Sequence, residues 1–465
     1  MYTNLKERLD PFPENGHVYG KVIDIKPRTE GVINYYEITI DIVNDNMIEF
    51  DKNNYNIIKL HNKDNYEDPS LYFYYLIIRT LDIKTIYYFQ NRYGQGYFKY
   101  KISEEDPGEI SSQFGNFRIP SLLTNSIHSI SGEILFYSSP AISKQYRIFL
   151  TDEEADVFEA EIPEECIIKD KVLIQIKLSE LFDVSNGRVD EANIYHVGSG
   201  YYSYFQYSNG NRFFYDIGLT KFKDRETIRC PGHGYDKFKF VILSHWDADH
   251  FMGITLHEKG KQNIILSKPW ICSSLINGTN ATRLAFLIRY YSGNNLIMID
   301  QNISGILYNN SHLSLIKGYC NAGTFNEMKN GNGISLFIKN FKRFVVLGDV
   351  GYKYLDSNTF PFNSTDYLVV PHHGSDKVGN INIKPRGRYS LAIIPVGKNT
   401  VKWTHPRKCV IDTLVDSGYT IHQTNIKGSL KVNLNRNSII KRCFAYLKTV
   451  KSKFRLLLNK IRINL

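Results

Sequence analysis

The chain has 465 residues, 42% of them hydrophobic, which is enough for two or three domains with buried cores. It has no uninterrupted apolar run of about 18 residues and does not begin like a secretory signal, so we expect a cytoplasmic protein without a transmembrane segment. The six cysteines are scattered without a C-x-x-C pair, and the net charge of +10 invites a nucleic-acid partner.

Residues 1–185 form the first predicted domain. Short β-prone runs such as HVYGKVIDI, YYEITIDIV and YFYYLIIRT are separated by turns rich in Asn, Gly, Pro and Asp. This pattern is typical of a β-rich domain, and we expect a sandwich of two sheets. The segment carries no catalytic constellation. Recognition, scaffolding or the binding of a protein partner is therefore the role we expect for it.

Residues 186–435 form the second predicted domain, in which apolar runs alternate with loops and helical stretches. We expect ANIYHVGSG and NRFFYDIG to be the two strands of one hairpin, and NIIL, ISLFIK, DYLVVP and LAIIPV to be further strands. Pro406 and Gly418 bracket the segment RKCVIDTLVDS, which predicts a helix there. The alternation indicates a layered α/β domain.

The stretch SHWDADHFMG follows the apolar run FKFVIL and places His245, Asp247, Asp249 and His250 within six residues. Alternate residues on a loop leaving a strand point the same way, so one pair can face one metal ion while the next pair faces a second. Taken alone, the cluster is equally consistent with a solvated loop, because polar turns are common.

Further polar residues stand at the ends of other predicted strands. Asp349 ends FVVLGD, the pair His372 and His373 follows VVP, and Asp216 ends RFFYD. His405 stands just before the predicted helix. Strand ends that carry such residues together favour a metal site over a solvated loop.

The order of these motifs resembles that of metallo-β-lactamase-fold hydrolases. It is most similar to the soluble hydrolase domain of ComEC-type DNA-uptake proteins, which read H-x-D-x-D-H in place of the commoner H-x-H-x-D-H. The resemblance covers about residues 190–435. It implies an α/β fold of the αββα sandwich type, in which two sheets pack between helices and two divalent metal ions lie at one sheet edge.

The resemblance also implies a ligand set. His245 and Asp247 would hold one ion, Asp249 and His250 would hold the other, and Asp349 would bridge the two. Asp247 stands where the wider superfamily has a His. Candidates for an additional His ligand between residues 251 and 348 are limited to His257 and His312, and Asn332 lies where the ComEC-like branch tends to have Asn or Ser.

The remaining residues of the pattern have implied roles as well. One member of the pair His372 and His373 would complete the second ion site, and Asp216 would orient the ligands from behind them. His405 would contact a substrate phosphate or donate a proton, which makes it a candidate catalytic residue together with Asp249.

Two cations that share a water lower its pKa and stabilise charge on a phosphoryl oxygen, so hydrolysis is the expected reaction. The oxygen-rich ligands favour manganese or magnesium beside zinc. The resemblance implies a phosphodiesterase or nuclease acting on DNA or RNA. Two alternatives stay open: a hydrolase of cyclic or small nucleotides, lactones or thioesters, and a metal- or ligand-binding sensor module with an incomplete site.

Residues 436–465 carry almost the whole basic excess. They contain nine Lys or Arg and no Asp or Glu, so the rest of the chain has 48 basic against 47 acidic residues. Their apolar residues recur at helical spacing, which predicts an amphipathic helix with a basic face. This face could meet water, nucleic-acid phosphates or the surface of a membrane.

Overall fold

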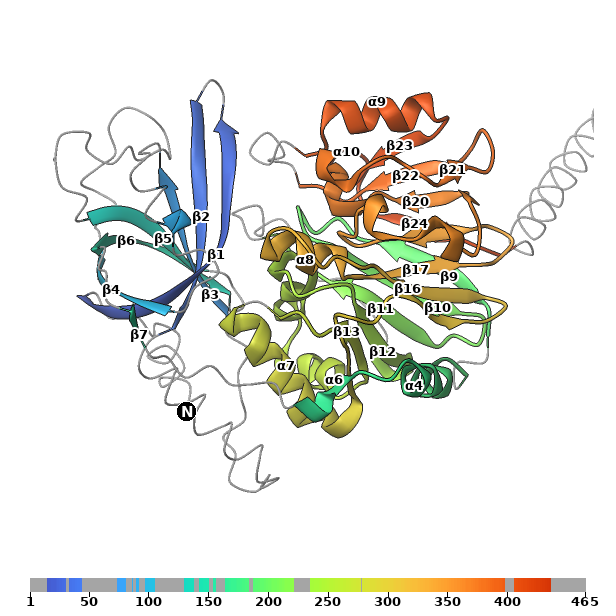
Figure 1. The fold of residues 1–465 in the computed structure, drawn as a ribbon, viewed down its shortest axis with the longest axis horizontal. Helices are drawn as coiled ribbons and strands as arrows, with labels where there is room; N and C mark the ends of the chain where they lie inside the picture. The colour runs from blue at the N-terminus through green and yellow to red at the C-terminus, as the bar shows by residue number, and fades with distance from the viewer. Residues whose placement is uncertain are drawn as a thin grey trace, which may run out of the picture.

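The computed structural model describes residues 15–30, 33–43, 73–80, 86, 89–91, 97–104, 129–137, 142–149, 154–155, 164–183, 187–220, 235–276, 278–397 and 405–435. The protein is of the mixed α/β class, with an N-terminal sheet beside a larger body whose described residues form two large sheets and a two-stranded one (Figure 1). The basic helix predicted for residues 436–465 lies outside the described residues.

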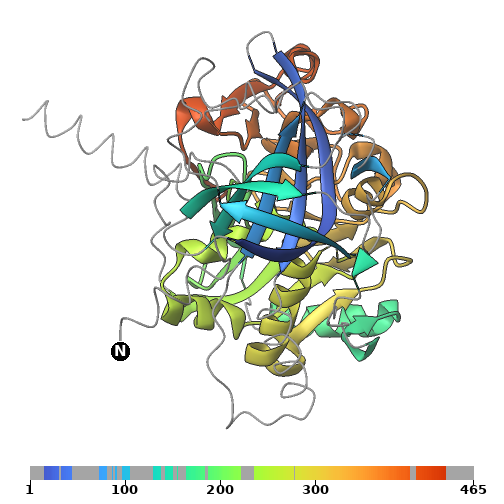
Figure 2. The ribbon, with the colours of Figure 1, turned by 90° about the vertical axis from the view of Figure 1, so that its left-hand side faces the viewer.

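The N-terminal sheet consists of β1 (Asn15–Glu30), β2 (Ile33–Val43), β3 (Phe73–Thr80), β4 (Tyr97–Glu104), β5 (Ser129–Tyr137), β6 (Ile142–Phe149) and β7 (Glu154–Ala155). Its strand order is β1-β2-β3-β5-β6-β4-β7, and β4 also pairs with β1, so the sheet closes on itself (Figure 2). The expected two-sheet sandwich is therefore wrong. The 16-residue β1 is long enough to pair with β2 along most of its length and with β4 at its start.

The first sheet of the larger body has the order β24-β9-β10-β11-β12-β13-β14-β8. Its strands are β8 (Ile167–Ile168), β9 (Val189–Ile194), β10 (Tyr202–Tyr207), β11 (Arg212–Ile217), β12 (Phe238–Leu243), β13 (Trp270–Ser273), β14 (Leu296–Ile299) and β24 (Leu430–Asn433). Strand β10 lies between β9 and β11, so the expected direct hairpin of these two is wrong. The aromatic run YSYFQY is itself a strand.

The second sheet of this body has the order β15-β16-β17-β18-β20-β22-β23. Its strands are β15 (Gly305–Asn309), β16 (Leu313–Lys317), β17 (Ile334–Ile338), β18 (Phe344–Val346), β20 (Tyr367–Val369), β22 (Leu391–Ile394) and β23 (Thr420–Gln423). A short parallel pair, β19 (Ser364–Thr365) with β21 (Lys384–Pro385), stands apart from it.

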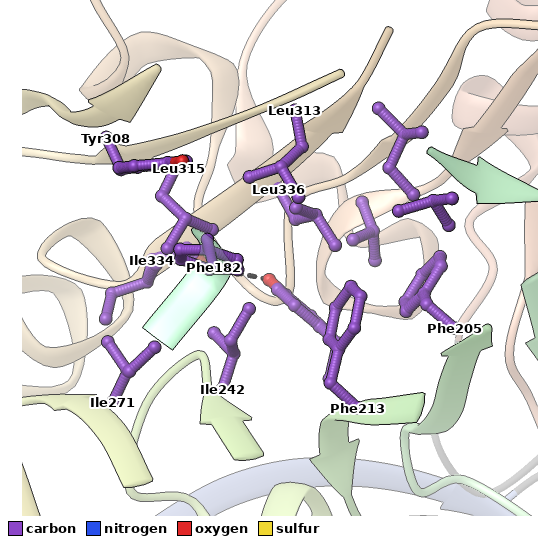
Figure 3. Packing of buried hydrophobic residues seen from close by; sticks show 14 of the residues in the cluster. Phe182, Phe205, Phe213, Ile242, Ile271, Tyr308, Leu313, Leu315, Ile334 and Leu336 are labelled. Atoms are coloured by element: carbon purple, nitrogen blue, oxygen red, sulfur yellow. Dashed lines mark hydrogen bonds between the residues drawn. The ribbon is translucent and has the colours of Figure 1, made fainter. Parts of the chain in front are cut away.

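A continuous apolar core fills the space between these two sheets (Figure 3). Phe213 and Phe240 of the first sheet stack with ring centroids 4.9 Å apart, and Phe182 of α4 (Lys171–Asp183) meets Phe240 edge-on at 4.9 Å. Leu315 and Leu336 face them from the second sheet and are fully buried. Truncating such a leucine to alanine costs about 2–5 kcal/mol, so this layer fixes how the sheets meet.

Helices cover the outer faces of both sheets. On the first sheet lie α6 (Lys259–Leu266) and α7 (Thr279–Ser292), and on the second lies α9 (Lys408–Asp416). The run NIIL belongs to α6, so its expected strand is wrong; a short apolar run does not separate strand from helix. The helix expected after Pro406 is confirmed as α9, and Gly418 follows it with φ +96°.

The N-terminal sheet packs on α7 through a buried polar contact. The Asp41 carboxylate of β2 accepts hydrogen bonds from the backbone N–H and the side-chain amide of Asn280, over 3.0 and 2.8 Å. Ile23 of β1 joins the apolar cluster beneath α7. Because the buried carboxylate takes two donors from one helix end, it sets the position of the sheet relative to the larger body.

Among the described residues, no helix combines the length and the apolar character needed to cross a membrane. The short helices α5 (Ala248–Phe251), α8 (Phe325–Gly331) and α10 (Thr424–Lys427) complete the larger body.

Candidate metal centre

The polar strand ends predicted from the sequence meet at one edge of the larger body. The H-x-D-x-D-H motif follows β12, which runs parallel to β11, and Asp216 is the second-last residue of β11. Asp349 follows β18, and the His pair follows the parallel neighbour β20. Since parallel strands bring their carboxyl ends to the same edge, residues distant in the sequence are collected there.

Asp216 fixes the orientation of His250. Its Oδ2 accepts a hydrogen bond from Nδ1 of His250 over 2.8 Å, while its oxygens also accept from the backbone N–H and hydroxyl of Ser244 at 2.7 and 2.8 Å. All three residues are fully buried. Asp216 adopts a left-handed φ of 54°, a conformation that persists only where the surroundings hold it.

Two other imidazoles are held in the same way. The hydroxyl of Ser244 donates to Asp216, so it can accept from Nδ1 of His245 at 3.1 Å. Nδ1 of His373 donates to the backbone carbonyl of Pro395 over 2.7 Å. In their neutral forms, His245, His250 and His373 therefore all carry the lone pair on Nε2.

These Nε2 atoms converge on carboxylates. His250 Nε2 lies 3.1 Å from Oδ1 of Asp349, and His373 Nε2 lies 3.4 Å from Oδ2 of Asp249. Within the described part of the chain, His250 Nε2, His373 Nε2 and Asp349 Oδ1 are buried and have no partner in hydrogen-bond geometry. Buried polar atoms in this state call for a ligand, and a divalent cation is a ligand that both imidazole nitrogens and carboxylate oxygens bind.

Among the residues that the structure describes, two groups of side chains have the spacing to hold a metal ion. One is His245, His250 and Asp349, and the other is Asp249, His250 and His373. Both groups use His250, whose Nδ1 already bonds Asp216. A single imidazole nitrogen binds one ion, so the two groups cannot both be filled through it.

Asp247 is bound differently from the sequence expectation. Its Oδ2 lies 3.1 Å from Nε2 of His245, but its Oδ1 accepts a hydrogen bond from the ammonium of Lys329 on α8. The Lys329 side chain is only 3% exposed. The structure thus brings Asp247 to the centre and pairs it with a cation of the protein itself.

The geometry separates the two members of the His pair. His373 joins Asp249 and His250, whereas Nε2 of His372 lies 3.7 Å from the other oxygen of Asp349. The ring of His372 also faces that of His405, with centroids 5.8 Å apart. Both residues of the pair have left-handed φ values, 48° and 53°, the kind of backbone strain that clusters at functional sites.

The charges of the centre shift the pKa values of its members. Burial lowers the pKa of His250, but the carboxylates of Asp349 and Asp216 outweigh it and raise the pKa well above the ordinary value. Burial also lowers the pKa of His373, but the carboxylates of Asp249 and Asp349 outweigh this effect and raise the pKa above the ordinary value. The pKa of Asp349 is held well below its usual range by His372 and His250 against the effect of burial. The site therefore attracts positive charge.

The additional candidate ligands His257 and His312 belong to neither group of side chains spaced to hold a metal ion. His257 is held between the hydroxyls of Tyr202 and Tyr235, at 3.0 and 2.7 Å, and burial lowers its pKa to about 4. His312 immediately precedes β16, and its backbone N–H donates to Oδ1 of Asn310. Asn332 uses its side chain to bond Lys317 and two backbone carbonyls.

A cleft of about 420 Å³ opens over the centre. Asp247, Asp249, Asp349, His372, His373 and His405 line it, as do the lysines Lys353 and Lys377. The lining also includes Ile25 and Tyr36 of the N-terminal sheet and Gln90. Two lysines near the carboxylates suit an anionic substrate, because the lysines and a bound cation together would neutralise its negative charge.

Three residues of the site carry no signature in the sequence. Ser244 links Asp216 to two imidazoles, and the ring of Tyr201 stacks on His250 with centroids 5.7 Å apart and planes 11° apart. Lys329 bonds Asp247. The T-x-x-E capping box from Thr324 to Glu327 marks the start of α8 in the sequence. The residues around Lys329 do not indicate which side chain it contacts.

Comparison of the sequence with protein-family models finds no match, and comparison with curated proteins finds none either.

Proposed function

We propose that this protein is a hydrolase that depends on a divalent metal ion and belongs to the metallo-β-lactamase-fold type. The observation that carries the proposal is the common orientation of His245, His250 and His373. Each directs Nδ1 to an oxygen outside the centre and Nε2 toward Asp349 or Asp249. Backing of ligand imidazoles by oxygen acceptors is the usual arrangement in protein metal sites.

The residues fit a divalent ion. Asp249, His250 and His373 would hold it beside Asp349, and this mixture of carboxylate oxygen and imidazole nitrogen suits zinc or manganese, with magnesium as a third option. A bound divalent ion supplies activation of water near neutral pH and stabilisation of charge on a phosphoryl oxygen.

The chain's own residues prepare the site for this chemistry. Asp216 and Ser244 hold the imidazoles, and Tyr201 covers the buried face of His250. His405 lines the cleft beside His372, where it can contact a phosphate or donate a proton to a leaving oxygen. Lys353 and Lys377 attract the anionic substrate.

We propose a phosphodiester of DNA or RNA as the substrate, because the cleft combines two lysines with metal-type ligands. The cleft volume of about 420 Å³ is that of a small-ligand pocket, which suits one or two nucleotides of a single strand better than a duplex. The same volume favours a cyclic or small nucleotide as the second candidate, since pockets for small ligands measure about 300–1,000 Å³.

Incubation of the purified protein with single- and double-stranded DNA, RNA and cyclic nucleotides tests the proposal, in the presence of manganese, magnesium or zinc. We expect metal-dependent cleavage of single-stranded nucleic acid and its loss with a chelator. Asp349→Ala should lose most bound metal and activity while keeping the fold, because Asp349 borders both candidate ligand groups.

Metal analysis separates this enzyme from a binding module. Tightly held metal together with turnover supports the hydrolase, whereas ligand binding without any turnover supports a sensor. Full activity in Asp349→Ala would refute the proposed centre. Deleting residues 436–465 tests the predicted basic face separately: loss of nucleic-acid contacts should flatten the salt dependence of binding, by about 0.7–0.9 in the log–log slope for each contact, while leaving metal content unchanged.

A further inference from the structure

Lys329 and Asp247 form an ion pair at the candidate metal centre, next to His245. Lys329 is near the C-terminal end of α8, and its ammonium donates to Oδ1 of Asp247. The lysine side chain is 3% exposed, and that of Asp247 is 25% exposed. A buried ammonium needs a counter-charge, and Asp247 supplies it. Asp247 is therefore paired with the Lys329 ammonium.

The end of α8 is held in place by its own hydrogen bonds. Asn332 donates from Nδ2 to the backbone carbonyls of Met328 and Cys320, over 2.8 and 2.6 Å. The ammonium of Lys317 in turn donates to Oδ1 of Asn332 over 3.1 Å. Gly331 packs so closely that a Cβ at this position would come within 2.5 Å of the Cβ of Cys320. These contacts fix the turn from which Lys329 reaches Asp247.

Neither group of side chains spaced to hold a metal ion includes Asp247. A divalent ion bound to Asp247 would compete with Lys329 for the carboxylate. The ion would also lie next to the Lys329 ammonium, and two positive charges repel strongly in a buried site. The group formed by Asp249, His250 and His373 is free of this conflict. The arrangement therefore suits one divalent ion on that side and the lysine ammonium on the other.

We propose that Lys329 occupies the place of a second divalent ion, so that the centre binds one ion per chain. Lys329 is then a positioning residue: it holds Asp247, which in turn lies 3.1 Å from Nε2 of His245. The proposal rests on the proposed metal-dependent function and revises the two-ion expectation from the sequence. It concerns the number of ions and leaves the class of reaction unchanged.

The test counts metal ions on the full chain, by elemental analysis after dialysis and by titration calorimetry with manganese and with zinc. We expect one ion per chain in the unmodified protein and two in Lys329→Met, because removal of the ammonium frees Asp247. The double variant Lys329→Met with Asp247→Asn should return to one ion. Lys342→Met is the matched control, since it removes another Lys–Asp pair, 2.9 Å from Asp366, and should keep one ion.

A second measurement does not depend on the folding of Lys329→Met. Asp247→Asn should still bind one ion at saturating metal, with lower affinity, because Asp247 is not a ligand in this proposal but its substitution leaves the ammonium of Lys329 without its counter-charge. No ion in a folded Asp247→Asn at saturating metal, two ions in the unmodified protein, or a single ion in a folded Lys329→Met would each overturn the role of Lys329. Two ions in the unmodified protein would leave the proposed hydrolase standing, whereas no bound ion at all would refute both.

Discussion

Nδ1 of His250 donates a hydrogen bond to Oδ2 of Asp216 over 2.8 Å, and this contact turns Nε2 toward Asp349. Asp216→Asn weakens the acceptor and removes the negative charge behind the imidazole. We expect the affinity for the divalent ion to fall by about 10- to 100-fold, the usual effect of losing a carboxylate that orients a ligand imidazole. Metal titration by calorimetry measures this change.

Asp366→Asn is the matched control for Asp216→Asn. Asp366 is also buried, but it pairs with Lys342 and Arg386 away from the centre. Its substitution should lower stability and leave metal affinity as in the unmodified protein. Equal metal affinity in both variants would show that the Asp216 contact does not orient a metal ligand.

Metal binding should release protons. The neighbouring carboxylates raise the pKa of His250 and of His373 above the ordinary value, and an imidazole must lose its proton to bind a metal. At pH 7 we expect about one to two protons to be released for each metal ion bound. The affinity for the metal should keep increasing at pH values above the range in which an ordinary His titrates. Calorimetry in buffers of different ionisation enthalpy counts these protons, and their absence at pH 7 would contradict the assignment.

His405→Ala should slow turnover without removing metal. His405 lies beside His372 in the lining of the cleft and belongs to neither group of candidate ligands. Loss of a positioned proton donor or phosphate contact lowers the rate by about 100-fold or more. His312→Ala, which changes a His outside the cleft, serves as the control. A metal content that falls in parallel with the rate would make His405 a ligand instead.

Tyr36 should contribute to the binding of substrates that extend beyond the scissile phosphodiester. It lies on the wall of the cleft formed by the N-terminal sheet. If its ring stacks on a base, Tyr36→Ala costs about 1–3 kcal/mol, which raises KM for a trinucleotide by about 5- to 150-fold. A chromogenic phosphodiester without a base should be much less affected. Tyr389→Ala, at a 74% exposed position outside the cleft, is the control, and equal effects on both substrates would exclude base stacking.

His257 should make folding stability depend on pH. Burial lowers its pKa from 6.5 to about 4 in the folded protein. Between these values the unfolded chain binds the extra proton, so stability falls as the pH falls through this window. The contribution lost between pH 7 and pH 5 is about 2 kcal/mol.

His257→Gln removes this titration while retaining a polar side chain between Tyr202 and Tyr235. Urea unfolding at pH 7 and pH 5 should therefore show a smaller acid-induced loss of stability in the variant than in the unmodified protein. The same pH dependence in both proteins would show that His257 titrates normally in the fold.

The sequence by itself determined the residue types of the centre and their positions at strand ends. The apolar runs before Asp216, Asp349 and the His pair predicted strands, and the structure has β11, β18 and β20 there. The helix after Pro406 was predictable for the same reason. Apolar runs, caps and strand-end ligands are local patterns, and local patterns can be interpreted without knowing what packs against them.

The tertiary structure alone decided which partners these residues have. Lys329 meets Asp247 across 82 positions of the chain, and Asn280 meets Asp41 across 239. The closure of β1 on β4 and the choice of His373 over His372 likewise depend on distant strands. Short-range periodicity carries no information about such contacts, because they arise only when separate elements share one core and one edge.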